Sequence, residues 1–183
     1  MNLFKVIKER LFMSDEQYMR KHGVKVGKHC SISTRMIPSE GYLLEIGNYV
    51  RIAANTSFYS HGGIWALRHL MNDPNLDIFG KIIIGDYTSI GSNVMVMPGV
   101  TIGKGCIVGG GSVVTKSVPD GCMVAGNPAR FIGYTEDFYK RLKNGLDFAC
   151  KQMSIEEKEY LIKNAPDEKF IHKPYIKLPE EIL

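Results

Sequence analysis

A six-residue repeat in the middle of the chain limits the folds that this sequence can adopt. From Ile84 onward, a branched aliphatic residue recurs at every sixth position, and glycine follows it in most copies. The repeated aliphatic positions are Ile84, Ile90, Val96, Ile102, Val108 and Val114. A small side chain lies four residues after each of them, at Thr88, Val94, Val100, Cys106, Ser112 and Val118. Shorter runs of the same pattern begin at Val26, Ile32, Ile46 and Ile52.

The period of six matches neither the turn of an α-helix nor the spacing of a simple hairpin. It fits short, flat strands joined by tight corners, with one branched side chain buried in each strand. Glycine, asparagine or aspartate is expected at corners where φ becomes positive. Successive turns of such a chain stack as parallel strands about 4.8 Å apart, so the repeat predicts a β-solenoid.

The composition suits this fold and narrows the classes of function. The 183 residues are enough for one domain with a substantial core, and 44% hydrophobic with 23% charged residues is typical of a globular protein. The net charge of +4 is modest, which suits an anionic small ligand and argues against a nucleic-acid partner. The four cysteines form no C-x-x-C pair, which argues against a zinc site or a disulfide framework and favours the cytoplasm.

Residues 1–13 are apolar but interrupted by charges, so they lack the continuous core of a signal peptide. Leu3, Phe4, Ile7 and Leu11 would share one face of a helix, with cations on the opposite face. We interpret this segment as a short helix that caps the domain. A helix that makes weak contact with a membrane surface is the alternative.

The pattern divides the chain into three parts. We expect an N-terminal helical cap at residues 1–23 and the solenoid at residues 24–133, with an inserted loop at residues 61–81. Helices and a tail should occupy residues 134–183.

Capping signals place the helices on both sides of the solenoid. Ser14 and Gln17 have the spacing of a capping box, and Gly23 should end the helix that they begin. After the solenoid we expect one helix over residues 135–150 and a second that opens at Ser154, followed by an extended tail.

The repeat stops after Phe58 and resumes near Ile84, and a histidine lies where it stops. The intervening segment is too long for a corner, and long loops on rigid scaffolds often carry function. His61 lies at the exit of a rigid strand, where an imidazole is well held for general-base chemistry. A surface histidine without a role is the alternative for His61, and it is the preferred interpretation for His69 farther along the loop.

The tandem of isoleucine or valine, glycine and a later small residue resembles the hexapeptide-repeat acyltransferases. This resemblance implies a mainly β fold, a left-handed parallel β-helix with short N-terminal and C-terminal helices, and a homotrimer with active sites between subunits. In the galactoside, maltose and streptogramin-type acetyltransferases of this superfamily, the catalytic histidine lies at the corresponding loop, which implies that His61 is catalytic. The γ-type carbonic anhydrases share the solenoid but bind zinc through histidines. Residues 82–133 contain no histidine, so we expect no metal.

The stretch from Ile84 onward resembles the C-terminal coils of sugar and xenobiotic O-acetyltransferases, which bind coenzyme A between subunits. The resemblance implies that Ser92 and Gly110 line the pantetheine channel and that acetyl-CoA is the co-substrate. It places Thr115 and Lys116 near the outer part of the cofactor and Arg130 at its phosphates. The chemistry agrees, because a glycine lets backbone amides approach a ligand and cations pair with phosphates. Corner-forming glycines and solvated cations are the alternative interpretation.

Together these patterns predict an acetyl-CoA-dependent O-acetyltransferase that acts by direct transfer in a ternary complex, with His61 as the general base. The spacing of His61, Gly63, Trp65 and Asp77 resembles polysaccharide and lipopolysaccharide-precursor O-acetyltransferases, which implies a saccharide hydroxyl, for example in a capsule precursor, as acceptor. Trp65 would stack on a pyranose, or would instead hold the loop down. Acetylation of a xenobiotic, an amino acid or an amino sugar is the alternative. A non-catalytic assembly module is the alternative of another class.

Overall fold

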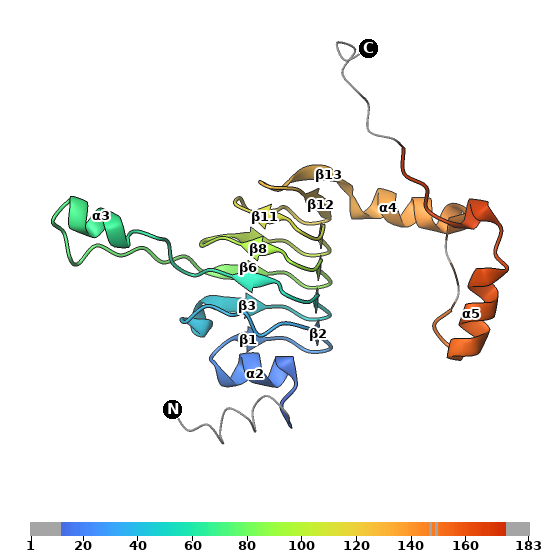
Figure 1. Ribbon diagram of the computed structural model, residues 1–183, viewed down its shortest axis with the longest axis horizontal. Coiled ribbons are helices and arrows are strands. Elements are labelled where there is room, and N and C mark those ends of the chain that lie inside the picture. Colours follow the sequence, from blue (N-terminus) through green and yellow to red (C-terminus); the bar gives the residue numbers. More distant parts are fainter. Residues whose placement is uncertain (1–11, 147, 149, 175–183) are drawn as a thin grey trace, which may run out of the picture. The chain divides into compact units, whose positions relative to one another are not determined.

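The short strands of the repeat form three sheets, and the chain visits the sheets in turn (Figure 1). The computed structural model describes residues 12–146, 148 and 150–174. The chain divides into two compact units, one up to Thr135 and one from Glu136 onward. Within the described residues, no helix has the length and apolar character needed to cross a membrane. The interpretations of residues 1–13 mostly concern residues that lie outside this part.

Each sheet collects the strands from one side of the successive coils. The first sheet contains β1 (Lys25–Val26), β3 (Leu44–Ile46), β6 (Ile82–Ile84) and β9 (Thr101–Ile102). The second sheet contains β2 (Ser31–Ile32), β4 (Arg51–Ile52), β7 (Ser89–Ile90), β10 (Ile107–Val108), β12 (Cys122–Ala125) and β13 (Arg130–Tyr134). The third sheet contains β5 (Ser57–Phe58), β8 (Met95–Val96) and β11 (Val113–Val114). These strands pair in parallel, and β13 ends the second sheet by pairing antiparallel with β12.

The repeated aliphatic side chains fill the space between the three sheets. The six repeat positions from Ile84 to Val114 are at most 2% exposed. The side chains four residues later are buried as well, with Val118 the most accessible at 6%. Each coil therefore adds to one continuous apolar column. Burying a branched side chain of this size contributes about 1.5–3 kcal/mol to the free energy of folding. The parallel strands and the inward positions predicted from the repeat are therefore confirmed.

Aromatic side chains stack along one corner of the coils, where glycine, asparagine or aspartate was expected. His29, Tyr49 and Tyr87 have φ angles between 55° and 59°, a region that is uncommon for residues other than glycine. The ring centroids of His29 and Tyr49 are 4.7 Å apart, and those of Tyr49 and Tyr87 are 5.0 Å apart. Lys104 Nζ lies 5.7 Å from the centroid of Tyr87. A stacked aromatic pair contributes about 0.5–1.5 kcal/mol, which helps to offset the cost of the left-handed backbone.

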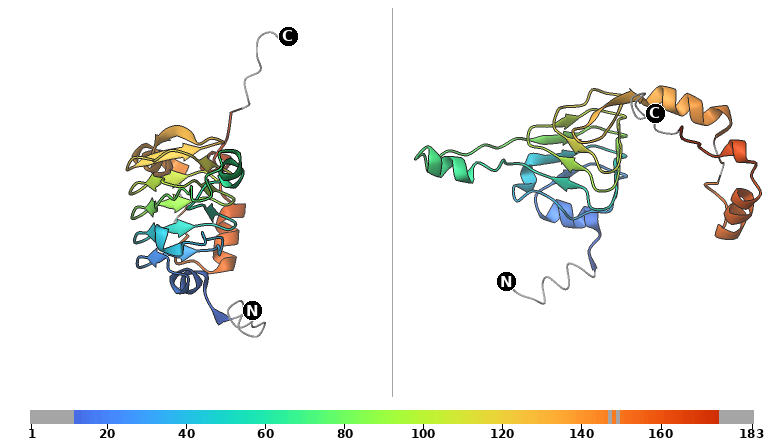
Figure 2. Two further views of the ribbon diagram at one scale, coloured as in Figure 1. Left: turned by 90° about the vertical axis from the view of Figure 1, so that its left-hand side faces the viewer. Right: turned by 45° about the horizontal axis from the view of Figure 1, so that its top comes forward.

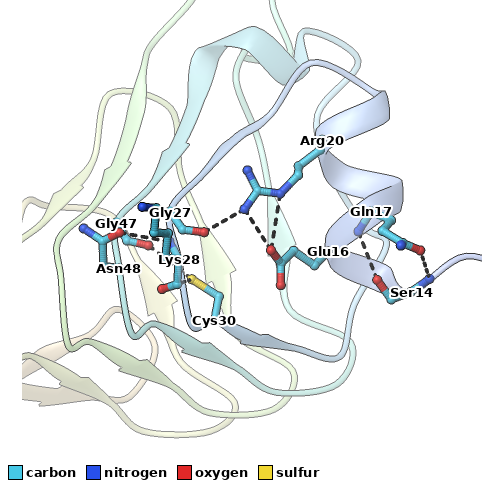
Figure 3. Close-up of polar contacts among 9 residues, drawn as sticks. All are labelled: Ser14, Glu16, Gln17, Arg20, Gly27, Lys28, Cys30, Gly47 and Asn48. Atoms are coloured by element: carbon cyan, nitrogen blue, oxygen red, sulfur yellow. Dashed lines mark hydrogen bonds and ion pairs between the residues drawn. The ribbon is translucent and has the colours of Figure 1, made fainter.

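The first coil is covered by α2 (Asp15–Lys21), which Figure 3 shows with its polar contacts. The predicted capping box is confirmed, because Gln17 N–H donates to Ser14 Oγ at 3.2 Å and Ser14 N–H donates to Gln17 Oε1 at 3.0 Å. The Arg20 guanidinium donates to the carbonyl oxygen of Gly27 at 2.7 Å. This bond ties the helix to the coil beneath it.

Between β5 and β6 the chain leaves the coils as a long arm, residues 61–81, which projects away from the sheets (Figures 1 and 2). The arm carries α3 (Trp65–Leu70), a helix that the sequence did not predict. Its two ends are held together, because Gly80 N–H donates to the Ser60 carbonyl oxygen at 2.7 Å. His61 and Phe79 form an isolated antiparallel bridge beside this bond. The start of the arm is therefore held against its end by backbone contacts.

The outer part of the arm is held by its own polar contacts. The Arg68 guanidinium pairs with the Asp77 carboxylate and donates to the Leu76 carbonyl oxygen. Trp65 is 70% exposed, and its ring centroid lies 4.6 Å from that of His69 on the same arm. The arm keeps its shape through Arg68 and leaves the indole accessible.

The second unit contains the C-terminal helices. It begins within α4 (Thr135–Arg141), which is followed by the irregular helical segment η2 (Leu142–Leu146). The expected helix over residues 135–150 is therefore wrong in length, because Gly145 adopts a φ of 105° and interrupts the helical backbone. The other helices of this unit are α5 (Ile155–Lys163), whose predicted start at Ser154 is confirmed, and the single turn η3 (Asp167–Lys169) in the segment expected to be extended.

Candidate active site

His61 is the first residue of the arm, and its ring is hydrogen-bonded to a carboxylate. Its Nδ1 atom is 3.0 Å from Oε2 of Glu40, and the hydroxyl of Ser60 donates to the same oxygen at 2.5 Å. Ser60 is buried, whereas the His61 side chain is 48% exposed and that of Glu40 is 21% exposed. The imidazole is thus held by Glu40 on its Nδ1 side, while about half of the side chain is accessible.

The contact with Glu40 determines which nitrogen of His61 can act as a base. A carboxylate accepts hydrogen bonds, so the neutral ring carries its proton on Nδ1 and leaves the lone pair of Nε2 free. The Ser60 hydroxyl and then the His61 ring hold the pKa of Glu40 below its ordinary value. Glu40 therefore stays ionised at neutral pH, and its negative charge would stabilise a positive charge on the neighbouring ring.

Two hollows adjoin His61. The first has a volume of about 360 Å³ and is mostly apolar; its lining includes Met36, Ile37, Pro38, Phe58 and His61. The second has a volume of about 430 Å³ and lies along the arm; it is lined by His61, Gly62, Gly63, Ile64, Trp65, Arg68 and Asp77. An imidazole between two concavities is suitably placed to act between two substrates.

Two of the expected cofactor residues lie together at one corner of the coils. Ser92 follows β7 and Gly110 follows β10, and the Gly111 N–H donates to the Ser92 carbonyl oxygen at 2.8 Å. A Cβ atom on Gly110 would lie 3.2 Å from that oxygen, which is tight but leaves the outer surface open. Gly91 is different, because a Cβ there would lie 2.5 Å from the Gly110 nitrogen. Close packing of coils thus explains Gly91 without a ligand.

The cationic residues form a separate group at the end of the coils. Lys116 and Arg130 line one hollow of about 520 Å³ together with the exposed rings of Phe131 and Tyr134. The centroids of these two rings are 5.0 Å apart. Thr115 directly precedes Lys116 at the exit of β11. A hollow with two cations and two aromatic rings suits a ligand that carries both phosphate and a flat base.

The structure does not bring all predicted site residues together within one chain. His61 follows β5 of the third sheet, whereas Ser92 and Gly110 follow strands of the second sheet and precede the third. The width of the third sheet therefore separates the imidazole from the Ser92–Gly110 corner. Trp65, in contrast, shares the second hollow with His61.

The sequence did not identify Glu40 or Ser60 as parts of the site. Glu40 lies in an irregular segment before η1 (Gly41–Leu43), where no repeat pattern marks its position. One signal was present: Glu40 precedes Ser60 by 20 residues, the same separation that joins Lys25 to Glu45 across neighbouring coils. A carboxylate one coil before a candidate base is therefore a useful search criterion in this fold.

Comparison with known proteins identifies the family of this chain. Residues 81–116 match the family model described as bacterial transferase hexapeptide (six repeats). Protein CapG of Staphylococcus aureus is 38% identical over 159 residues, which cover 85% of this chain and 91% of CapG. The chain belongs to the hexapeptide-repeat acetyltransferases.

Two solved structures extend this family assignment to the donor. A maltose O-acetyltransferase of Clostridium difficile has a TM-score of 0.56 and 27% identity, with 71% of this chain and 81% of that chain covered. A hexapeptide-repeat acetyltransferase of Vibrio cholerae, complexed with acetyl coenzyme A, has a TM-score of 0.54 and 26% identity, with 70% of this chain and 82% of that chain covered. This hexapeptide-repeat protein is thus an acetyl-CoA-dependent acyltransferase, and the alternative of a non-catalytic module is wrong.

Proposed function

We propose that this acetyltransferase transfers an acetyl group from acetyl-CoA to a hydroxyl of a saccharide, with His61 as the general base. The observation that supports the proposal is the bond between His61 Nδ1 and Glu40, which leaves Nε2 free on a ring that lines both hollows. The similarity to a maltose O-acetyltransferase supports a sugar hydroxyl as the acceptor. The donor and the four free cysteines fit an enzyme of the reducing cytoplasm.

The proposed reaction is direct transfer in a ternary complex. His61 Nε2 accepts the proton of the acceptor hydroxyl while that oxygen forms a bond to the thioester carbonyl carbon. A backbone N–H of the glycine-rich coil would stabilise the negative charge on the carbonyl oxygen. The carbon–sulfur bond then breaks, and His61 returns its proton to the departing thiolate. The products are the acetyl ester and free coenzyme A, so atoms and charges balance.

Glu40 has a positioning role in this scheme, and its substitution tests that role. Glu40→Gln removes the charge that stabilises the imidazolium and loosens the hold on the ring. We expect kcat to fall by about 10- to 100-fold, the loss that follows from a small displacement of a catalytic group, with little change in the KM for acetyl-CoA. Glu45→Gln is the matched control, because the Glu45 carboxylate pairs with Lys25 and the Glu40 carboxylate pairs with His61. Equal kinetics for the two variants would show that Glu40 has no such role.

The cofactor phosphates are proposed to bind at Lys116 and Arg130, with Thr115 nearby and Ser92 and Gly110 along the pantetheine. Hydrogen bonds to charged groups contribute about 1.5–3 kcal/mol, so Lys116→Ala and Arg130→Ala should each raise the KM for acetyl-CoA about tenfold or more. The KM for the acceptor should not change. Lys28→Ala removes the same charge from the exposed corner of the first coil and should leave both constants unchanged. A similar effect of all three variants would show that only net charge matters.

A complete site is proposed to form between copies of the chain in a homotrimer, with coils of the left-handed sense that the family implies. The separation of His61 from the Ser92–Gly110 corner by the third sheet supports this arrangement, because one chain holds the two parts of the site on opposite edges of that sheet. The half-exposed Met36 and the Met95 side chain, 43% exposed, give the third sheet an apolar outer surface for a neighbour.

Mixing two inactive variants tests this arrangement. His61→Ala removes the base, and Ser92→Trp should block the channel at an exposed position on the other edge of the third sheet. In mixed trimers about one quarter of shared sites receive both intact parts, so activity should return to about a quarter of the normal value. The measurement is thiol release after subunit exchange. Activity that stays at the level of the separate variants would place each site within one chain.

A further inference from the structure

The hollow between His61 and Trp65 has features of a site for an uncharged sugar ring. Its volume of about 430 Å³ lies in the range of small-ligand sites, about 300–1,000 Å³. Trp65 is 70% exposed and contributes an accessible flat apolar surface. A Cβ atom on Gly63 would meet no atom within 4 Å, so the backbone between His61 and Trp65 leaves this space open. A ligand resting on the indole would therefore lie in the same hollow as the imidazole.

The charged groups of this hollow, besides the imidazole of His61, are one cation and one anion that balance each other. The Arg68 guanidinium pairs with one oxygen of Asp77, and the other Asp77 oxygen accepts the Ile78 N–H at 2.9 Å. Both side chains remain partly accessible, at 27% for Arg68 and 40% for Asp77. A guanidinium has five N–H donors and a carboxylate about four acceptor sites, so each keeps capacity for further hydrogen bonds.

We propose that this hollow is the acceptor site and that it selects a neutral pyranose, which stacks on Trp65 and hydrogen-bonds to Arg68 and Asp77 through neighbouring hydroxyls. This inference rests on the proposed function and deepens it by naming the acceptor class. Each sugar hydroxyl can accept a hydrogen bond from a guanidinium N–H or donate one to a carboxylate oxygen. Neighbouring hydroxyls can therefore bind Arg68 and Asp77 at the same time. A carboxylate on the sugar would compete with Asp77 for Arg68, and an ammonium would compete with Arg68 for Asp77, so the paired charges disfavour both. Arg68 and Asp77 thereby act as specificity-determining residues.

The chain offers a direct reporter, because Trp65 is its only tryptophan. In the His61→Ala variant, which should not turn over, tryptophan emission is titrated with methyl α-D-glucopyranoside, methyl α-D-mannopyranoside, D-glucuronate and D-glucosamine at constant ionic strength. We expect a saturable change with at least one neutral glycoside and binding of the charged sugars that is about tenfold weaker or more. No saturable change with either neutral glycoside, or tighter binding of a charged sugar, would overturn the proposal.

A charge change in the hollow separates recognition from a structural role. Asp77→Asn leaves the Arg68 cation unbalanced, so the preference should move toward D-glucuronate by about tenfold or more. Asp73→Asn is the matched control, because Asp73 lies on the same arm, accepts the Asn75 N–H and does not line the hollow. If Asp77→Asn only disrupted the fold, the binding of all four sugars would weaken and no preference for an anion would appear. That result would also contradict the proposal.

The proposed function is tested separately by acetyl-CoA turnover. Thiol release that depends on His61 with a different hydroxyl compound, together with no emission change from the glycosides, would refute the pyranose site and leave the transferase chemistry intact. Absence of His61-dependent thiol release with every acceptor would refute the proposed function itself.

Discussion

Replacing His61 with alanine should lower the turnover of acetyl transfer by about 10²–10⁴-fold, the usual contribution of a positioned general base. The variant keeps Glu40, Ser60 and the neck of the arm, because the backbone bond between Gly80 and Ser60 does not involve the imidazole. The donor residues lie elsewhere, so the KM for acetyl-CoA should stay close to its normal value. The measurement is steady-state thiol release at saturating acetyl-CoA.

A second histidine variant makes the result specific to His61. His172 is an exposed residue of the C-terminal unit, with its ring 3.0 Å from the Asp167 carbonyl oxygen. His172→Ala should therefore turn over at the normal rate. Near-normal turnover in His61→Ala would remove the imidazole from the mechanism and leave Glu40 without a partner to position.

The second large effect concerns the coil itself. Ile84→Ala should lower the free energy of unfolding by about 2–5 kcal/mol, because the change leaves a cavity in the apolar column between the sheets. Ile84 is 1% exposed and lies on β6, at the centre of the first sheet between β3 and β9. Equilibrium unfolding in urea, followed by circular dichroism, measures the loss.

The neighbouring residue on β6 is the matched control. Ile83 is 38% exposed, because successive side chains of a strand point to opposite faces. Ile83→Ala removes the same atoms and should cost less than about 1 kcal/mol. Equal losses for the two variants would mean that the inward and outward positions of the repeat have been assigned wrongly.

The features that follow from the six-residue repeat could be predicted from the sequence. The features formed by irregular segments could not. The six-residue spacing was sufficient to predict the strands and to place Ile84 and Cys106 in the core, because each coil repeats the same local geometry. Glu40 was not predicted as a site residue, because its contacts join a segment outside the repeat to the next coil. The helix at Trp65 escaped because it has no capping side chain and only six residues. Lys116 and Arg130 were expected in one binding region, but the rings of Phe131 and Tyr134 beside them were not.

The narrow neck of the arm has an evolutionary consequence. The Gly80–Ser60 hydrogen bond and the His61–Phe79 bridge join the two ends of the arm. The arm therefore connects to the coil in the same way as a short corner would. Sequence and length beyond that point can therefore diverge without disturbing the scaffold beneath. His61, the proposed base, would keep its place at the start of the arm if the outer part were replaced. New acceptors can thus be acquired by changing a peripheral segment, and the inherited chemistry at the root is retained.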